Sequence, residues 1–439
     1  MNTHQTELAQ SKVYLNGVHR RTVILPILVT CLLFHCIRTY QVTSQQPTDF
    51  RIFYESSRDA LAGRNPYRVT PSHLPYIYPP LLIWMVTPLT EYSLHLASQI
   101  WTILSFVAWI VLVVGSLRIM GIPARSATTV LLAVPSILAY RFILRQTLHG
   151  QVDMMVWAVT IFAINCMLDR RERLSGSLFA IAIVTKPIPI FFILFLLIKR
   201  QWRTIAWFIL ISTVLLIIPS VTYGTTRNIE ILDQWVHGRI GQDLTDISFE
   251  VTSANQSIQA MLYRYFGRRD FDIREQWPAP ATILENKWVN GLYLVFCTSI
   301  LSSVLVISRE LGPFRERAAL ELALMVAITH LVSRRTTEYH LVSQVFTYTV
   351  AIACIQSDSL SRCWRLAFAL TTAGMGFLQN FYSPLFVGMV TSTRWQSYSP
   401  SGLSQLLFWS VVTFALSRWQ KNGSVRCQEQ KCHVNDDPH

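Results

Sequence analysis

Residues 48–80 hold the side chains of this chain that are best suited to chemistry. The segment lies between two apolar runs and combines carboxylates, arginines, tyrosines and several prolines. It begins with Pro47-Thr48-Asp49, which is typical of a helix start capped by an aspartate. The same carboxylate could act as a general base that removes a proton from a hydroxyl group. The residues alone favour neither role for Asp49, and the two roles are compatible.

Residues 49–61 predict an amphipathic helix that lies on a membrane surface. Its apolar residues fall at helical spacing, namely Phe50, Phe53, Tyr54, Ala60 and Leu61. Arginines occupy the other positions, and a guanidinium group binds phosphate through two parallel hydrogen bonds. For any one arginine, contact with lipid headgroups is the commoner role. The candidates for phosphate binding are Arg51, Arg58, Arg64 and Arg68.

Tyrosines and prolines mark the end of the same segment. Gly63-Arg-Asn-Pro-Tyr67 ends the predicted helix, and Tyr76-Ile-Tyr-Pro-Pro opens the next apolar run. Proline is tolerated there because the first turn of a helix does not need its N–H. Interfacial tyrosines also form simple membrane belts, so a substrate contact depends on the ordered combination rather than on any single tyrosine.

Three later polar residues border apolar runs. Lys186 lies between two runs, where a lysine is unfavourable unless it pairs or reaches water. We expect it either to bind substrate or to extend its charge to the membrane surface. Gln151 and Asp153 begin a run, where helix capping competes with a contact to substrate.

Two more polar segments are candidates for binding. Residues 255–257 offer hydrogen-bonding groups, with loop structure as the alternative role. His340 follows the pair Arg334-Arg335 in a turn that we expect outside the membrane. Arginines usually stay on the inner side, so this exception suggests an anionic ligand. An imidazole that can be protonated would suit a position beside a leaving phosphate.

The composition shows what surrounds these residues. The chain has 439 residues, of which 51% are hydrophobic and only 14% are charged, and its mean hydropathy is +0.34. Soluble domains carry about a quarter charged residues, so this chain is predicted to be an integral membrane protein. Apolar runs recur from residue 23 to residue 417, and we expect 11 to 13 membrane-spanning helices.

Charge and cysteine usage exclude other classes. The net charge is +13, but the basic residues gather at the ends of apolar runs, as in His19-Arg20-Arg21. Such clusters are cytoplasmic anchors rather than a nucleic-acid surface. Most of the eight cysteines lie in or beside apolar runs, where cysteine behaves as a small hydrophobe, so no disulfide framework is expected. Cys427-x4-Cys432-His433 fits no strong zinc pattern.

The charge pattern also predicts the organisation. Residues 1–21 are expected to form a cytoplasmic tail, 22–420 a polytopic membrane domain and 421–439 a polar tail. External loops are expected at about 40–76, 223–287 and 333–340. The charge pattern does not decide on which side of the membrane the turns between residues 94 and 186 lie. The segment around Lys186-Pro-Ile-Pro189 is predicted to break a helix.

Several motifs follow one another in a recognisable order. Three motifs come first: D-x4-Y, G-x-N-P-Y and Y-x-Y-P-P-L. Four segments follow them along the chain: Gly150-Gln-Val-Asp153, Thr185-Lys-Pro-x-Pro189, Ser253-Ala-Asn-Gln-Ser257 with Arg264, and His340. Over residues 50–350 this order resembles glycosyltransferase family 87 of the GT-C superfamily. The chain departs from the family pattern around the histidine, where only Tyr339-His340 stands in place of a longer tryptophan- and His-His-containing motif.

The resemblance implies an all-α, polytopic GT-C-type bundle that uses a polyprenyl-phosphate sugar as donor. It places the catalytic carboxylate in the first external loop, which here is Asp49, and it makes His340 a second catalytic candidate. No Asp-x-Asp occurs in that loop, so neither a metal nor another cofactor is expected. The expected substrate-binding residues are Arg51, Arg58, Tyr67, Tyr76, Tyr78, Gln151, Asp153, Lys186, Asn255, Gln256, Ser257, Arg264, Arg334 and Arg335.

The predicted function is transfer of one sugar (mannose, another hexose or arabinofuranose) to a glycolipid or glycan hydroxyl. The reaction is expected on the extracytoplasmic face of the cytoplasmic membrane, with membrane lipids but no nucleic acid as further partners. The alternative is a polytopic transporter or flippase of lipid-linked or small polar solutes. That class more often shows internal repeats with interrupted helices in matching halves, and no such halves are visible in the sequence.

Overall fold

The computed structural model describes residues 48–69, 75–123, 127–237, 252–267, 284–307, 315–357 and 360–433. Within these ranges the chain is built from helices, and the only strand-like pairing is an isolated bridge between Gly267 and Leu284. The expected all-α fold is confirmed. The predicted first span at residues 23–38 and the tail at 1–21 lie outside the described residues.

Three described helices are long and apolar enough to cross a membrane: α4 (Leu94–Ile119), α10 (Trp202–Ile217) continued by α11 (Ser220–Tyr223), and α15 (Asn286–Ser302) continued by η5 (Ser303–Val306). A fourth span is possible if α5 (Thr129–Leu138) and α6 (Tyr140–His149), bent by 61°, cross as one. The chain is therefore a membrane protein, and the figure of 11 to 13 spans stays a prediction.

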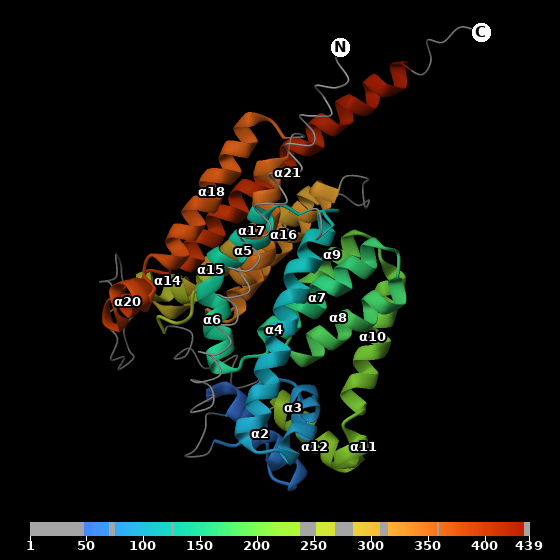
Figure 1. Cartoon of the computed structure of the whole chain (residues 1–439), viewed down its shortest axis with the longest axis vertical. Helices are drawn as coiled ribbons and strands as arrows, with labels where there is room; N and C mark the ends of the chain where they lie inside the picture. Colours follow the sequence, from blue (N-terminus) through green and yellow to red (C-terminus); the bar gives the residue numbers. More distant parts are fainter. Residues whose placement is uncertain are drawn as a thin grey trace, which may run out of the picture.

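Two helices at the centre of the bundle are buried on every face. In α16 (Arg315–Val332) residues 318–331 are all buried, and in α17 (Gln344–Gln356) residues 344–354 are. Helices that are apolar all round belong inside a bundle, since no face of them prefers water. Around this centre, α4 packs on α7 (Asp153–Leu168), α7 packs on α8 (Glu172–Thr185), and α8 packs on α10. The long helix α21 (Pro400–His433) packs on α16 and on α18 (Arg362–Asn380) (Figure 1).

Short helices gather at one end of the bundle. There, α2 (Thr48–Leu61) and α3 (Pro80–Val86) lie near α11 and α12 (Thr225–Trp235), away from the far end of α21 (Figure 1). The remaining helices are η1 (Thr87–Glu91), η2 (Ile188–Phe191), α9 (Phe192–Ile198), α14 (Ile258–Phe266), η6 (His340–Ser343), α19 (Pro384–Val387) and α20 (Met389–Gln396).

The helix predicted at residues 49–61 is confirmed as α2, but its apolar face does not lie open to a membrane. Phe50 and Phe53 are buried, and their rings lie 5.2 and 6.1 Å from the ring of Trp101 on α4. The loop that follows α2 closes over the same face, with the Tyr76 ring 6.2 Å from Phe53. The apolar face of α2 is therefore covered by aromatic side chains of the protein, whereas the sequence pattern suggested that it contacts lipid.

The predicted break near Lys186 is also confirmed. α8 ends at Thr185, and Lys186 is extended, with φ −155° and ψ 117°. A residue before proline is pushed out of the helical region by the proline ring, and Pro187 follows directly. The break holds the lysine at the end of α8 instead of inside a continuous span.

Candidate active site

A close contact between two helix ends places Asp49 beside the 149–153 segment. Asp49 lies in the first turn of α2, and α6 ends at Gly150, which has φ +65°. A Cβ at residue 150 would come 2.6 Å from Cβ of Phe50, so both the conformation and the contact require glycine. The Gly150 carbonyl accepts a 2.8 Å hydrogen bond from Trp101 Nε1, which fixes this junction.

Asp49 is held through one carboxylate oxygen. Gln151 Nε2 donates to Oδ2 at 2.7 Å, and His149 Nδ1 lies 3.9 Å from the same atom. Oδ1 accepts no hydrogen bond from the part of the chain that the structure describes. The Asp49 side chain keeps 17% of its surface exposed, so the carboxyl group is not fully enclosed by the protein.

Burial raises the pKa of the Asp49 carboxyl above its usual value. The interaction with His149, the hydrogen bond from Gln151 and the charge of Lys186 oppose this rise, and the Asp153 carboxylate adds to it. A carboxylate with a raised pKa holds a proton more readily, which makes it a better general base near neutral pH.

Gln151 links Asp49 to a buried ion pair. Its Oε1 lies 3.4 Å from both Lys186 Nζ and the Tyr78 hydroxyl. Lys186 Nζ donates to Asp153 Oδ2 at 2.7 Å and lies 4.6 Å from the centre of the Tyr78 ring. The Asp153 side chain is fully buried, so its charge depends on this lysine. The Gln151 main-chain carbonyl is in turn bound by Gln146 Nε2.

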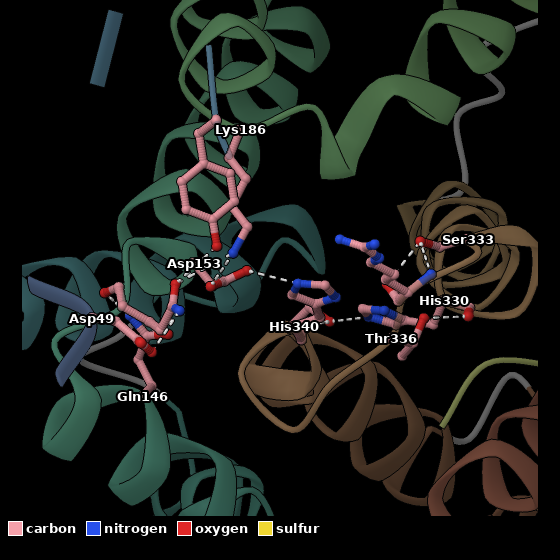
Figure 2. A network of polar contacts seen from close by, with 12 residues as sticks. Asp49, Gln146, Asp153, Lys186, His330, Ser333, Thr336 and His340 are labelled. Carbon is pink, nitrogen blue, oxygen red and sulfur yellow. Dashed lines mark hydrogen bonds and ion pairs between the residues drawn. The ribbon is translucent and has the colours of Figure 1, made fainter. Parts of the chain in front are cut away.

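His340 completes this side of the site. Its Nε2 lies 3.8 Å from Asp153 Oδ1, which is buried and accepts no hydrogen bond within the described ranges. Figure 2 shows Asp49, Asp153 and Lys186 on one side of His340, and Thr336 and His330 on the other. Thr336 Oγ1 donates to the His330 carbonyl at 2.7 Å, which shapes the turn that carries His340. The structure thus brings together six predicted residues, which we name the site cluster: Asp49, Tyr78, Gln151, Asp153, Lys186 and His340.

A second group of charged residues reaches Asp49 from α6. Arg145 Nη1 lies 3.5 Å from His149 Nε2, and its Nε lies 3.3 Å from Glu338 Oε2. Glu338 also pairs with Arg141 and accepts a 2.8 Å hydrogen bond from Gln396. The sequence reasoning missed His149, Arg145 and Glu338. The spacing of Arg141, Arg145 and His149, four residues apart, is the signal for one polar helix face that could have found two of them.

The other predicted tyrosines support the loop around Tyr78. The Tyr67 hydroxyl donates to the Tyr78 carbonyl at 3.1 Å, and the buried Tyr76 hydroxyl donates to the Pro79 carbonyl at 2.6 Å. Their hydroxyls are thus bound to main-chain groups, and their rings pack 5.4 Å apart.

The predicted arginines of α2 and its loop lie away from the site cluster. Arg51 and Arg58 are exposed, and Arg58 lies 4.0 Å from Glu55 on its own helix. Arg64 and Arg68 both bind Asp59, at 2.8 Å each. Their charges therefore serve, at least in part, to balance a buried carboxylate.

The residues predicted in the second loop form a separate group, which we name the tether cluster: Asn255, Gln256, Ser257 and Arg264. Asn255 Nδ2 and Ser257 Oγ both donate to the Arg334 carbonyl at 2.9 Å. Gln256 Nε2 donates to the Gln396 carbonyl at 2.9 Å, and Arg264 Nε to the Ser397 carbonyl at 2.9 Å. These bonds join α14 and the residues just before it to the loop before η6 and to the end of α20. Helix α20 lies beside α14 (Figure 1).

Arg334 and Arg335 lie between the two clusters. Arg334 Nε donates to Gln259 Oε1 at 3.2 Å. Both the main chain and the charge of Arg335 act on the His340 imidazole. Arg335 is thus the nearer of the pair to the site cluster.

No group of three histidine, cysteine, aspartate or glutamate side chains in the described ranges is placed to hold a metal ion. The side chains of Cys427, Cys432 and His433 lie outside this description.

Comparison with known proteins gives one match. The sequence model of a family described as glycosyltransferase family 87 matches residues 76–334. No curated protein and no solved structure matches the chain. The matched part contains Tyr78, Gln151, Asp153, Lys186 and the tether cluster, whereas Asp49 and His340 lie outside it.

Proposed function

We propose that this chain, which belongs to glycosyltransferase family 87, transfers one sugar from a polyprenyl-phosphate donor to a hydroxyl of a glycolipid or glycan. Family membership and the apolar helices make it a membrane glycosyltransferase. The proposed donor carries mannose, another hexose or arabinofuranose, and the proposed reaction takes place on the extracytoplasmic face of the cytoplasmic membrane.

The state of Asp49 is the observation that supports this proposal. Its carboxylate is fixed through Oδ2 by Gln151, and the side chain stays partly exposed beside the ion pair of Lys186 and Asp153. A carboxylate that is held by one oxygen and raised in pKa is suited to take a proton with the other.

In the proposed reaction, Asp49 Oδ1 takes the proton of the acceptor hydroxyl. The acceptor oxygen forms a bond to the anomeric carbon, and the bond from that carbon to the phosphate oxygen breaks. The electron pair leaves with the polyprenyl phosphate, so the reaction needs no co-reactant. Family resemblance implies inversion at the anomeric carbon.

The leaving phosphate gains negative charge and requires positive groups nearby. Lys186, His340 and Arg335 are proposed to supply them. The charge of Lys186 is balanced by Asp153 at 2.7 Å, so its field is weaker than that of an unpaired lysine. A proton on His340 would be stabilised by Asp153 Oδ1, 3.8 Å away.

Replacing Asp49 tests this function directly. Asp49→Asn keeps the size of the side chain but removes the base, so turnover should fall by at least about 100-fold. The purified protein in detergent is assayed with a set of polyprenyl-phosphate sugars, mannose first. Asp59→Asn is the matched control: it removes a carboxylate of the same helix whose partners among the described residues are Arg64 and Arg68. It should lower thermal stability and leave the turnover of the folded enzyme unchanged.

Folded Asp49→Asn enzyme with wild-type turnover would reject the general-base role. If no lipid-linked sugar is consumed by the wild-type protein while it moves lipid or solute across vesicle membranes, the proposed donor reaction is wrong and the chain acts as a transporter.

A further inference from the structure

His149 lies between the proposed base, Asp49, and the guanidinium group of Arg145, and it takes no part in the reaction proposed above. It is the last residue of α6, and Gly150 turns the chain directly after it. Its Nδ1 faces Asp49 Oδ2 at 3.9 Å, and its Nε2 faces Arg145 Nη1 at 3.5 Å. The imidazole also packs on the ring of Tyr339, with 5.1 Å between centres.

Arg145 decides where the proton of His149 is carried. A guanidinium group has only donors and stays protonated, so the imidazole nitrogen that faces it must offer a lone pair. Nε2 is therefore the acceptor, and the ring hydrogen of the neutral imidazole is on Nδ1. This tautomer directs an N–H group toward the carboxylate of Asp49.

The same arrangement makes His149 unsuited to take the proton from Asp49. Nδ1 already carries a hydrogen, and protonation of Nε2 would set two positive groups 3.5 Å apart. Glu338 holds Arg145 in place from the other side, at 3.3 Å. Burial of the ring and the charge of Arg145 together outweigh the Asp49 and Glu338 carboxylates, so a second proton on the imidazole is disfavoured and His149 is better suited to be a fixed donor than a proton acceptor.

We propose that His149 is a positioning residue, held in one tautomer by Arg145, that fixes the Asp49 carboxylate together with Gln151 and leaves Oδ1 for the acceptor hydroxyl. This inference rests on the proposed function, because it concerns the orientation of the proposed base. Both donors act on Oδ2, from opposite sides of the turn at Gly150. Catalytic contacts that are long without substrate shorten when substrate binds, which is the behaviour expected of the 3.9 Å contact.

The test compares His149→Ala with His149→Gln. The alanine variant loses the N–H donor, and misplacement of a base by about 1 Å lowers kcat by about 10- to 100-fold. KM for donor and acceptor should change by less than about threefold, since His149 is not proposed to bind either. Glutamine restores a donor to the same region, and His149→Gln should recover most of kcat. His237→Ala is the matched control, because that histidine is exposed and binds only Asp233 on its own helix among its described contacts.

The pH profile separates positioning from a structural role. His149 favours the charged form of Asp49, so its removal should raise the pKa of Asp49 further. The acid limb of kcat/KM should then move to higher pH in His149→Ala and stay near the wild-type position in His149→Gln. Among the described residues, the groups that face His149 are Asp49, Arg145, Glu338 and Tyr339, and they remain in both variants.

A His149→Ala enzyme with wild-type kcat and an unmoved acid limb would overturn the inference, provided that Asp49→Asn is inactive. If Asp49→Asn is itself active, the proposed function fails first. Should the alanine variant fail to fold, His149→Gln decides: a folded glutamine variant with kcat about 10- to 100-fold below wild type, although a donor is restored, rejects the role.

Discussion

The site cluster and the tether cluster are both buried and polar, but they differ in what their side chains bind. In the site cluster, bonds run from side chain to side chain, from Asp49 through Gln151 to Lys186 and Asp153. In the tether cluster, Asn255, Gln256, Ser257 and Arg264 bind mainly main-chain carbonyls of distant segments. The site cluster therefore keeps acceptor oxygens available for a substrate, whereas the hydrogen-bond donors of the tether cluster are already used to bind these carbonyls.

This difference separates a place for chemistry from a place for attachment. Buried main-chain carbonyls must be paired, and side chains that pair them stabilise the fold. Asp49 Oδ1 and Asp153 Oδ1 in the site cluster accept no hydrogen bond from the described residues, so they are not used to pair main-chain groups there. A substrate hydroxyl or a protonated imidazole can complete them, which is what a catalytic site requires.

The largest effect is expected from breaking the ion pair of the site cluster. Asp153→Asn leaves Lys186 as a buried charge without its carboxylate, which should lower the free energy of unfolding by about 3–5 kcal/mol. It also removes the group that would stabilise a proton on His340, so turnover should fall by about 100-fold or more. Thermal unfolding in detergent and sugar transfer are measured on the same preparation.

The double variant Asp153→Leu with Lys186→Met checks the physical cause. Because it removes both charges, it should be more stable than Asp153→Asn and still inactive. Recovery of activity along with stability would show that the pair only supports the fold, and the distinction between the clusters would then fail.

A second prediction uses pH to compare two carboxylates of α2. As pH falls through the raised pKa of Asp49, the base is protonated and kcat/KM should decrease by tenfold per pH unit below that pKa. Burial tends to raise the pKa of Asp59, but hydrogen bonds from Arg68 and Arg64 outweigh it, so the pKa lies below its usual value. The stability that Asp59 contributes is present above its unfolded pKa and is lost only as pH falls through the lower, folded pKa.

An acidic range should therefore exist in which the protein is folded but inactive. The measurement is a pH profile of kcat/KM beside a pH series of thermal unfolding. Coincidence of the two midpoints would mean that activity is lost by unfolding, and Asp49 would lose its special position in the comparison.

Much of the site cluster could be predicted from the sequence, because several of its members are residue types that are unusual at their positions beside apolar runs. A lysine between apolar runs and an aspartate at the start of another are unfavourable without partners, and Lys186 and Asp153 proved to be each other's partner. The helix at Asp49 and the break before Pro187 followed from local signals, and both are present. Local signals act over a few residues, which is why they were readable.

The pairing itself was not predictable, because Asp49 and Gln151 are 102 residues apart and meet only through the contact at Gly150. For the same reason the sequence could not separate the two clusters. Neighbouring polar residues such as Asn255 and Ser257 look alike whether they bind a sugar or the Arg334 carbonyl. Glu338 gave no signal, since its partners on α6 lie almost 200 residues away.

The smallest effect on catalysis is expected in the tether cluster, and it is the sharpest test of the comparison. Asn255→Ala leaves the Thr336 N–H and the Arg334 carbonyl each without one bond. An unpaired buried group costs about 1–3 kcal/mol, so thermal stability in detergent should fall by an amount of that order. The folded fraction should keep kcat within about twofold and KM for the donor unchanged, since the amide group is already bound to main-chain groups. A raised KM at wild-type stability would instead place Asn255 against the sugar, as its position in the sequence first suggested, and would join the two clusters into one site.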